Sequence, residues 1–187
     1  MKKVMTLLLC GLLLYACNDK ATESTTSMDS STNDGTTKMN ASNNDEAKEE
    51  RNKQTALASL HTFDNGGNVD GVFKEADKDV IDYGEGSMPP VKGLDSVKVG
   101  LGMWLKAVPD YKGSDFIAVA DGDYVMVYGN WTGTWTGNMM GMKPTGKKMK
   151  VADVDIFKFN DAGKIIEHRA VQSNHEAAMQ LGMKMPG

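Results

Sequence analysis

The C-terminal half of the chain changes from helical hydrophobic spacing to an alternation of period two, and this change constrains the fold more than any other feature. Four stretches are rich in β-branched and aromatic residues: 114–120, 124–137, 148–159 and 163–173. They are joined in pairs by two sequences typical of hairpin turns, Asp121-Gly122-Asp123 and Asn160-Asp161-Ala162-Gly163. We therefore predict an antiparallel sheet that contains two hairpins.

Helical patterns occupy the part of the chain before this sheet. Residues 45–62 are rich in helix formers, and apolar residues recur at helical spacing in 68–78. In 93–108 they form one stripe that ends before Pro109, while a short strand is expected at Val80–Tyr83. Three helices followed by a strongly bent antiparallel sheet predict an α+β architecture, with the helices packed on the concave side of the sheet.

The first residues predict an exported chain. Lys2 and Lys3 precede a thirteen-residue apolar run that is too short for a stable membrane-spanning helix. The ending Leu14-Tyr15-Ala16-Cys17 resembles the lipobox of bacterial lipoproteins, which implies cleavage before Cys17 and lipidation of that residue. The alternative is a simple secretory signal cut near Ala16. The lipobox predicts a protein of the bacterial cell envelope, extracytoplasmic and lipid-anchored to a membrane.

Three regions follow from this interpretation. Residues 1–16 are the signal peptide. Residues 17–44 are expected to be a disordered tether, because Ser, Thr, Asn and Asp dominate there and apolar residues are nearly absent. Residues 45–187 form one domain, which is long enough to bury a core.

Charge and motif content exclude several function classes. The chain has 21 Lys+Arg against 25 Asp+Glu, a net charge of −4, which argues against a nucleic-acid partner. Residues 141–148 have the spacing of a phosphate loop, but Lys148 stands where Ser or Thr must bind magnesium. One histidine with two carboxylates on adjacent strands is a weak metal constellation. We therefore expect neither a metal nor a cofactor.

Several motifs of the C-terminal half resemble those of the SnoaL-like polyketide cyclase family, within the nuclear-transport-factor-2-like superfamily. In chain order they are Gly133-Thr134-Trp135-Thr136-Gly137, Gly141-Met142-Lys143-Pro144-Thr145-Gly146-Lys147, Val154-Asp155-Ile156-Phe157, Gly163-Lys164-Ile165-Ile166-Glu167-His168 and Gln180-Leu181-Gly182. The resemblance spans roughly residues 50–183. It implies a cone-shaped α+β fold with an apolar pocket at its open end.

The sequence departs from this family pattern at two positions. Trp135 stands where the family has a histidine on its strand. Ala170 stands where the family has its acid/base aspartate. The second departure leaves open whether the chain is an enzyme.

Strand alternation nevertheless predicts a polar site. Asp153 and Asp155 are in phase with apolar neighbours on one strand, and His168 is in phase with Ile166 and Ala170 on the next. Asp82 belongs to the short first strand. We expect these residues to meet in one cavity lined also by Trp104, Trp131 and Trp135, with Met139, Met140 and Met142 lining it or its rim. Alternatively, His168 is an ordinary hydrogen-bonded histidine, the carboxylates are solvated, and the tryptophans are core.

Two functions remain open at this stage. The first is a binding module for a small apolar or aromatic molecule, which Ala170 favours. The second is an enzyme that abstracts a proton next to a carbonyl, as in cyclisation or isomerisation. In the enzyme, His168 is the candidate base, oriented by Asp155 or Asp153, and Trp135 or a protonated Asp82 is the candidate donor. The expected partners are the small molecule, the membrane through Cys17 and, as an open option, a second copy of the chain in a homodimer.

Overall fold

The computed structural model of the protein describes residues 34–139, 141–172 and 174–183. The elements are, in chain order, α1 (Asp34–His61), the 3-10 turn η1 (Thr62–Asn65), α2 (Val69–Val72), β1 (Ala76–Asp82), β2 (Val91–Lys92), α3 (Leu94–Ala107), β3 (Lys112–Asp121), β4 (Tyr124–Thr134), β5 (Lys148–Phe159), β6 (Ile165–Ala170) and α4 (Asn174–Leu181). The six strands form one sheet in the order β2-β1-β6-β5-β4-β3. The α+β architecture predicted from the sequence is thereby confirmed.

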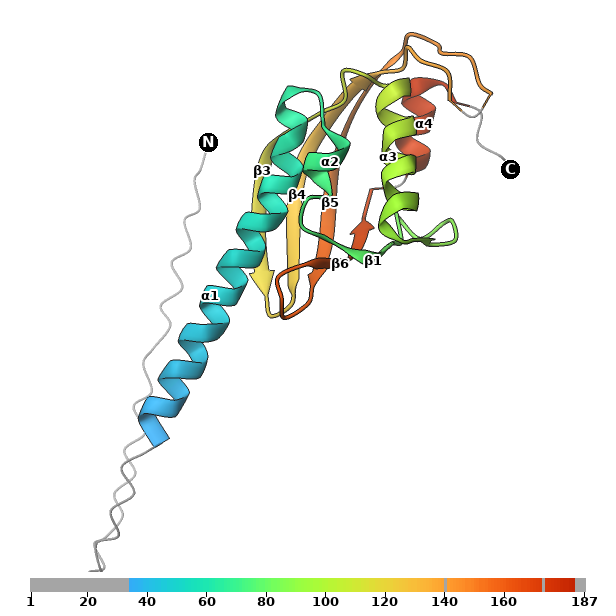
Figure 1. The fold of residues 1–187 in the computed structure, drawn as a ribbon. Helices are drawn as coiled ribbons and strands as arrows, with labels where there is room; N and C mark the ends of the chain where they lie inside the picture. Colours follow the sequence, from blue (N-terminus) through green and yellow to red (C-terminus); the bar gives the residue numbers. More distant parts are fainter. Residues whose placement is uncertain (1–33, 140, 173, 184–187) are drawn as a thin grey trace, which may run out of the picture.

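The helices cover one face of this bent sheet (Figure 1). Along β4 every second residue is buried, among them Val125, Val127 and Trp131, because alternate side chains face the helices. Helix α1 packs on β3 and β4, α3 packs on β1, and α4 packs on β5. The core therefore lies between the concave face of the sheet and the helices.

Bending of the sheet has a visible cause in β3. The register between β3 and β4 shifts between Ser114 and Ile117, and Asp115 has a left-handed φ of 58°. Such a bulge increases local twist and bend. The Asp115 carboxylate accepts a hydrogen bond from Asn130 Nδ2 at 3.0 Å, which holds the bulge against β4.

The sheet is mixed, whereas an antiparallel sheet was predicted. Strand β1 runs parallel to β6, with Ala76 paired to Ile165 and Asp82 to His168. The same pairing explains why the expected helix 68–78 is only α2, Val69–Val72. Beyond the helix, the Glu75 carbonyl accepts a hydrogen bond from the Ile165 N–H at 3.0 Å. The backbone at Glu75 is therefore bonded to β6 and cannot continue the helix.

Helix α1 begins eleven residues earlier than the sequence predicts. Residues 34–44, its first turns, were expected to belong to the tether. In the structure these turns extend beyond the sheet (Figure 1). The packed part of the helix is fixed by contacts such as Glu49 Oε1 with the Gly122 N–H, at 2.7 Å. Once a helix is nucleated, adding turns costs little, so it propagates backward without a tertiary partner.

The N-terminal predictions remain predictions. The expected signal peptide, residues 1–16, Cys17 and the first part of the tether lie outside the described residues. Within the part of the chain that the structure describes, no helix combines the length and the apolar character needed to cross a membrane.

Candidate active site

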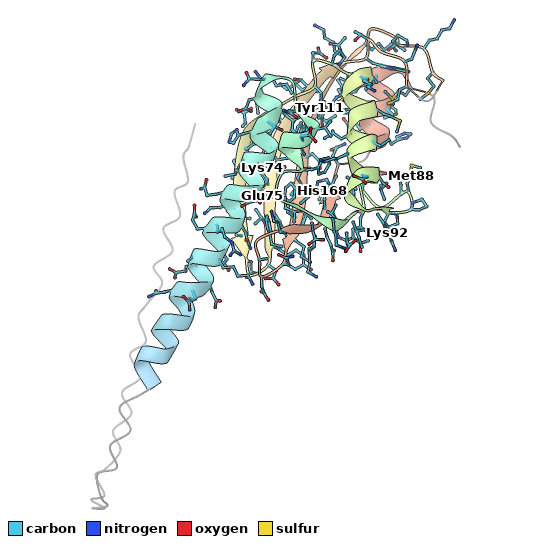
Figure 2. All side chains as sticks on the ribbon, viewed as in Figure 1. Lys74, Glu75, Met88, Lys92, Tyr111 and His168 are labelled. Atoms are coloured by element: carbon cyan, nitrogen blue, oxygen red, sulfur yellow. The ribbon has the colours of Figure 1, made fainter. Side chains whose placement is uncertain are left out.

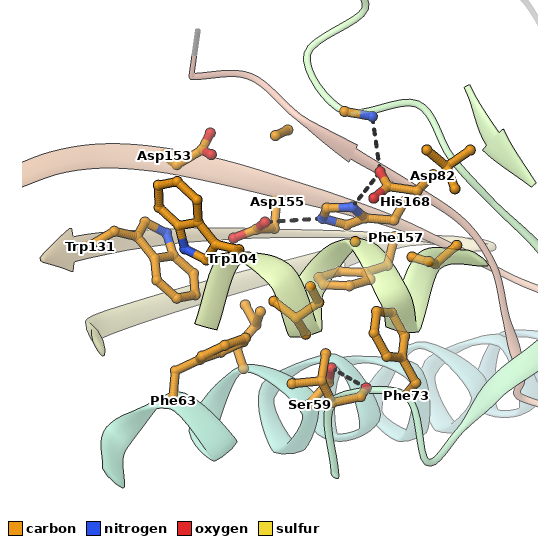
Figure 3. A pocket seen from close by; sticks show the side chains of 18 of the residues that line it. Ser59, Phe63, Phe73, Asp82, Trp104, Trp131, Asp153, Asp155, Phe157 and His168 are labelled. Carbon is orange, nitrogen blue, oxygen red and sulfur yellow. Dashed lines mark hydrogen bonds and ion pairs between the residues drawn. The ribbon is translucent and has the colours of Figure 1, made fainter. Parts of the chain in front are cut away.

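A cavity of about 400 Å³ lies between the helices and the sheet. This volume is typical of small-molecule pockets, which span about 300–1,000 Å³. Most residues singled out from the sequence line it, namely Asp82, Trp104, Trp131, Asp153, Asp155, His168 and Ala170. Figure 3 shows Asp82, His168 and Asp155 as one connected group on the sheet side, opposite Phe63 and Phe73 on the helical side.

Strand pairing brings the polar residues together. Asp82, at the end of β1, is the register partner of His168 on β6. His168 in turn lies opposite Phe157 on β5. Because alternate residues of a strand share a face, Asp153, Asp155 and Phe157 all point toward the cavity. In the view of Figure 2, the labelled His168 lies toward the middle of the molecule, whereas Met88 lies at the outer edge.

His168 is held between two carboxylates. Its Nδ1 lies 3.0 Å from Asp82 Oδ1, and its Nε2 lies 3.0 Å from Asp155 Oδ1. Burial alone lowers the pKa of His168, but the hydrogen bonds and charges of Asp155 and Asp82 outweigh it and raise the pKa to about 10. The ring is therefore an imidazolium at neutral pH, and both N–H groups donate to carboxylates.

The neighbours of His168 respond to its charge. Burial raises the pKa of Asp82, but the hydrogen bond and charge of His168 reverse this effect, so that the pKa falls below its usual value. The Gly84 N–H also donates to Asp82 Oδ1, at 2.9 Å. Asp82 is thus an ionised partner rather than the protonated donor that the sequence suggested as one option.

Asp153 has a different environment. Its Oδ1 accepts hydrogen bonds from the backbone N–H groups of Val154 at 2.6 Å, Val171 at 3.0 Å and Gln172 at 2.6 Å. Burial, together with the charge of Asp155, raises the pKa of Asp153 in spite of these bonds. The Asp153 carboxyl group therefore holds its proton more readily than an ordinary aspartate. It lines the same cavity as Ala170, whose register partner on β5 is Asp155.

Two buried polar atoms in the lining have no hydrogen-bond partner within the described residues. They are Asp155 Oδ2, an acceptor, and Trp131 Nε1, a donor. Asp155 is 7% exposed and Trp131 is 3% exposed, so bulk water does not satisfy them freely. Buried polar groups are normally paired, so these two atoms lack the partners that a folded chain usually supplies.

Tyr111 was not predicted as a site residue, because the sequence indicates only a turn around Pro109. The ring stacks on Trp131, with centroids 5.0 Å apart and an angle of 9° between the planes. Burial raises the pKa of Tyr111 well above its ordinary value, assisted by the charges of Asp155 and Asp153. Its hydroxyl therefore remains a donor. The sequence did carry one signal for this residue. An aromatic side chain stands directly after the turn that follows the amphipathic helix 93–108.

Trp135 does not line the cavity. It is fully buried, and its Nε1 donates to the Gly137 carbonyl at 2.7 Å, so the indole is core and not the donor that the sequence suggested. Met139 and Met142, which were expected to line the cavity or its rim, pair through their backbones and do not belong to the lining. Met140 lies outside the described residues.

The described residues of the site do not form a cluster of metal ligands. No group of three or more His, Cys, Asp or Glu side chains suited to a metal is found among residues 34–139, 141–172 and 174–183. A protonated imidazole has no lone pair to donate, so His168 is not a ligand in this state.

Comparison with known proteins gives consistent results. The sequence model of the SnoaL-like polyketide cyclase family matches residues 54–181. No curated protein sequence matches the chain. Among solved structures, AclR from Streptomyces galilaeus, a candidate hydroxylase, is 28% identical over 74% of this chain and 84% of its own, with a TM-score of 0.60.

Two further solved structures are similar in fold alone. A candidate SnoaL-like polyketide cyclase from Jannaschia sp. CCS1 is 22% identical over 74% of this chain and 95% of its own, with a TM-score of 0.64. A protein of ketosteroid isomerase-like fold from Catenulispora acidiphila is 14% identical over 71% of this chain and 98% of its own, with a TM-score of 0.57.

Proposed function

The chain belongs to the SnoaL-like polyketide cyclase family, and on that premise we propose that its cavity catalyses proton transfer at a carbon next to a carbonyl group. The substrate is a small, largely apolar or aromatic molecule, and the reaction is a cyclisation or an isomerisation. The observation that supports this most is Asp153, a carboxyl group of raised pKa that lines the cavity together with Ala170 and several apolar side chains. The family comparison favours this enzyme over the binding module that the sequence alone placed first.

We assign the base to Asp153 rather than to His168. Both nitrogens of His168 are engaged by carboxylates and protonated, so the ring has no lone pair for a substrate proton. Asp153 is anchored by three backbone N–H groups, and its raised pKa moves it toward the range in which a carboxylate exchanges protons efficiently. His168 becomes a positioning residue that fixes the carboxylate of Asp155.

The charge that develops on the carbonyl oxygen needs donors. The Tyr111 hydroxyl and Trp131 Nε1 are the candidates, since the first stays protonated and the second has no partner among the described residues. Preorganised donors of this kind are worth about 10²–10³ in rate each. Their stacked rings fix the position of both groups on the wall of the cavity.

A binding role without turnover is the second candidate. Ala170 supports it, since the strand residue beside His168 and opposite Asp155 carries no carboxylate. Under both candidates we retain the proposal of an extracytoplasmic protein anchored through a lipidated Cys17, which rests on the N-terminal sequence alone.

Deuterium uptake distinguishes these candidates. The probe is 2-tetralone, a bicyclic aryl ketone, and mass spectrometry in heavy water follows exchange next to its carbonyl. The wild-type protein should accelerate exchange over buffer, and Asp153→Asn should lose roughly 10²–10⁴ of that acceleration. Asp45→Asn, at an exposed position on α1, is the matched control and should behave as wild type. Equal exchange by wild type and Asp153→Asn, with the ketone bound, would contradict the assignment.

A further inference from the structure

The carboxyl groups that line the cavity outnumber its basic side chains. Its ionisable residues other than Tyr111 are Asp82, Asp153, Asp155 and His168, and no Lys or Arg belongs to the described lining. One imidazolium faces three carboxyl groups, so an excess of negative charge is held among apolar walls. In such a poorly solvated space, an unbalanced negative charge favours binding of a cation.

Within this group of carboxylates, Asp155 has one oxygen that is not hydrogen-bonded within the part of the chain that the structure describes. Its Oδ1 accepts a hydrogen bond from His168, whereas its Oδ2 has no hydrogen-bond partner among the described residues. The residue is 7% exposed, so its two oxygens are almost wholly removed from water. A carboxylate oxygen accepts hydrogen bonds and does not donate them when ionised. Oδ2 can therefore accept a hydrogen bond from a ligand, and a charged donor forms the strongest such bond.

Aromatic rings surround the same part of the cavity. Trp131 is stacked on Tyr111 and meets Phe63 edge-on at 5.2 Å between centroids, while Trp104 meets Tyr111 edge-on at 5.5 Å. Figure 3 shows Trp104 and Trp131 next to the Asp155 carboxylate. Aromatic faces beside a carboxylate are the usual surroundings of a bound ammonium group.

We infer that the cavity selects ligands that carry an ammonium group, with an N–H donated to Asp155 Oδ2 and an aromatic or alicyclic body against Trp104, Tyr111 and Trp131. Trp131 Nε1, which has no hydrogen-bond partner among the described residues, can donate to an acceptor on the same ligand, and a carbonyl supplies it. The substrate class is therefore an amine-bearing ketone. The carbonyl part of this inference rests on the proposed function, and the ammonium part does not.

The test is a calorimetric comparison of 2-aminotetralin with 2-hydroxytetralin at neutral pH. The two molecules share one body, and the amine is a cation whereas the alcohol is a neutral donor. We expect the wild-type protein to bind the amine at least tenfold more tightly, equivalent to about 1.4 kcal/mol. Equal affinities, tighter binding of the alcohol, or binding of neither would overturn the inference.

Two isosteric variants locate the effect. Asp155→Asn should lose the preference for the amine, because the amide can present an N–H where Oδ2 stands. Asp82→Asn removes the same charge while leaving Oδ2 of Asp155 intact, and it should retain most of the preference. Equal loss in both variants would show that Oδ2 is not the recognition point. If Asp155→Asn does not fold by circular dichroism, the wild-type comparison decides alone.

The outcome is separable from that of the proposed function. Tight binding of the amine, with 2-tetralone bound but not exchanged, would support the inference and defeat the enzyme. Exchange of 2-tetralone without preference for the amine would do the reverse.

Discussion

Raising the pH removes the proton from His168, and we expect this single event to weaken the fold measurably. Its pKa is about 10 in the folded protein against an ordinary value of 6.5. A group whose pKa is raised by folding stabilises the folded state fully below the unfolded pKa. That stabilisation is lost as the pH rises through the folded pKa. The window is therefore about pH 6.5 to 10.

The size of the loss follows from the difference between the two pKa values. At about 1.4 kcal/mol per pKa unit, the upper bound is about 5 kcal/mol. The imidazole is 27% exposed, so solvent screening reduces this, and we expect a loss of about 2–4 kcal/mol. For a domain of this size that is a large fraction of the total free energy of unfolding.

Urea unfolding at a series of pH values measures this directly. The wild-type free energy of unfolding should fall between about pH 6.5 and 10, whereas that of His168→Gln should be lower at pH 6.5 and nearly flat across the window. His61→Gln is the matched control, since His61 lies on the surface with Asp64 as its partner. A wild-type curve parallel to that of His168→Gln would refute the view that His168 carries a stabilising proton.

Three further predictions concern other parts of the chain. Ala170→Asp places a carboxyl group opposite Asp155 in the cavity that Asp153 also lines, and like charges should lower the melting temperature at neutral pH, with recovery as the pH falls toward 4. Gly129→Ala puts a methyl group 2.8 Å from the Phe116 ring and should cost about 1–3 kcal/mol in urea unfolding, while Gly102→Ala, with 3.9 Å to Val69, should cost nothing. Cys17→Ala should release the protein from the membrane fraction or leave it unprocessed, and unchanged processing and partitioning would show that Cys17 is not the anchor.

Much of the fold was predictable because each local signal agreed with the next. Strand β5, Lys148–Phe159, matches the predicted 148–159, and α3, Leu94–Ala107, lies within the predicted 93–108. The predictions of the fold that were wrong concern contacts between segments distant in the sequence. The parallel pairing of β1 with β6 joins segments about ninety residues apart, and it turned part of an expected helix into strand. Hydrophobic spacing carries no information about such a partner.

The site was predictable in its members more than in its chemistry. Strand alternation placed Asp153, Asp155, His168 and Ala170 on one cavity, and all four line it. Alternation also put Ile166 in phase with His168, but the cavity is lined by Ile165 instead. The cause is a register shift in the pairing of β5 with β6, between Lys158 and Phe159. The sequence suggested His168 as the base, whereas we propose Asp153. A sequence does not reveal that two carboxylates hydrogen-bond to one imidazole, and that geometry sets the charge of the ring.

The pH dependence of proton exchange tests the central claim most directly. If Asp153 is the base and His168 remains an imidazolium, exchange of 2-tetralone should rise along an acid limb above the ordinary aspartate value of 3.8, stay level through neutral pH, and decline near pH 10. Asp153→Asn should abolish the acid limb. A rate that is low at neutral pH and climbs toward pH 10, as the proton leaves His168, would identify the histidine as the base and contradict the account.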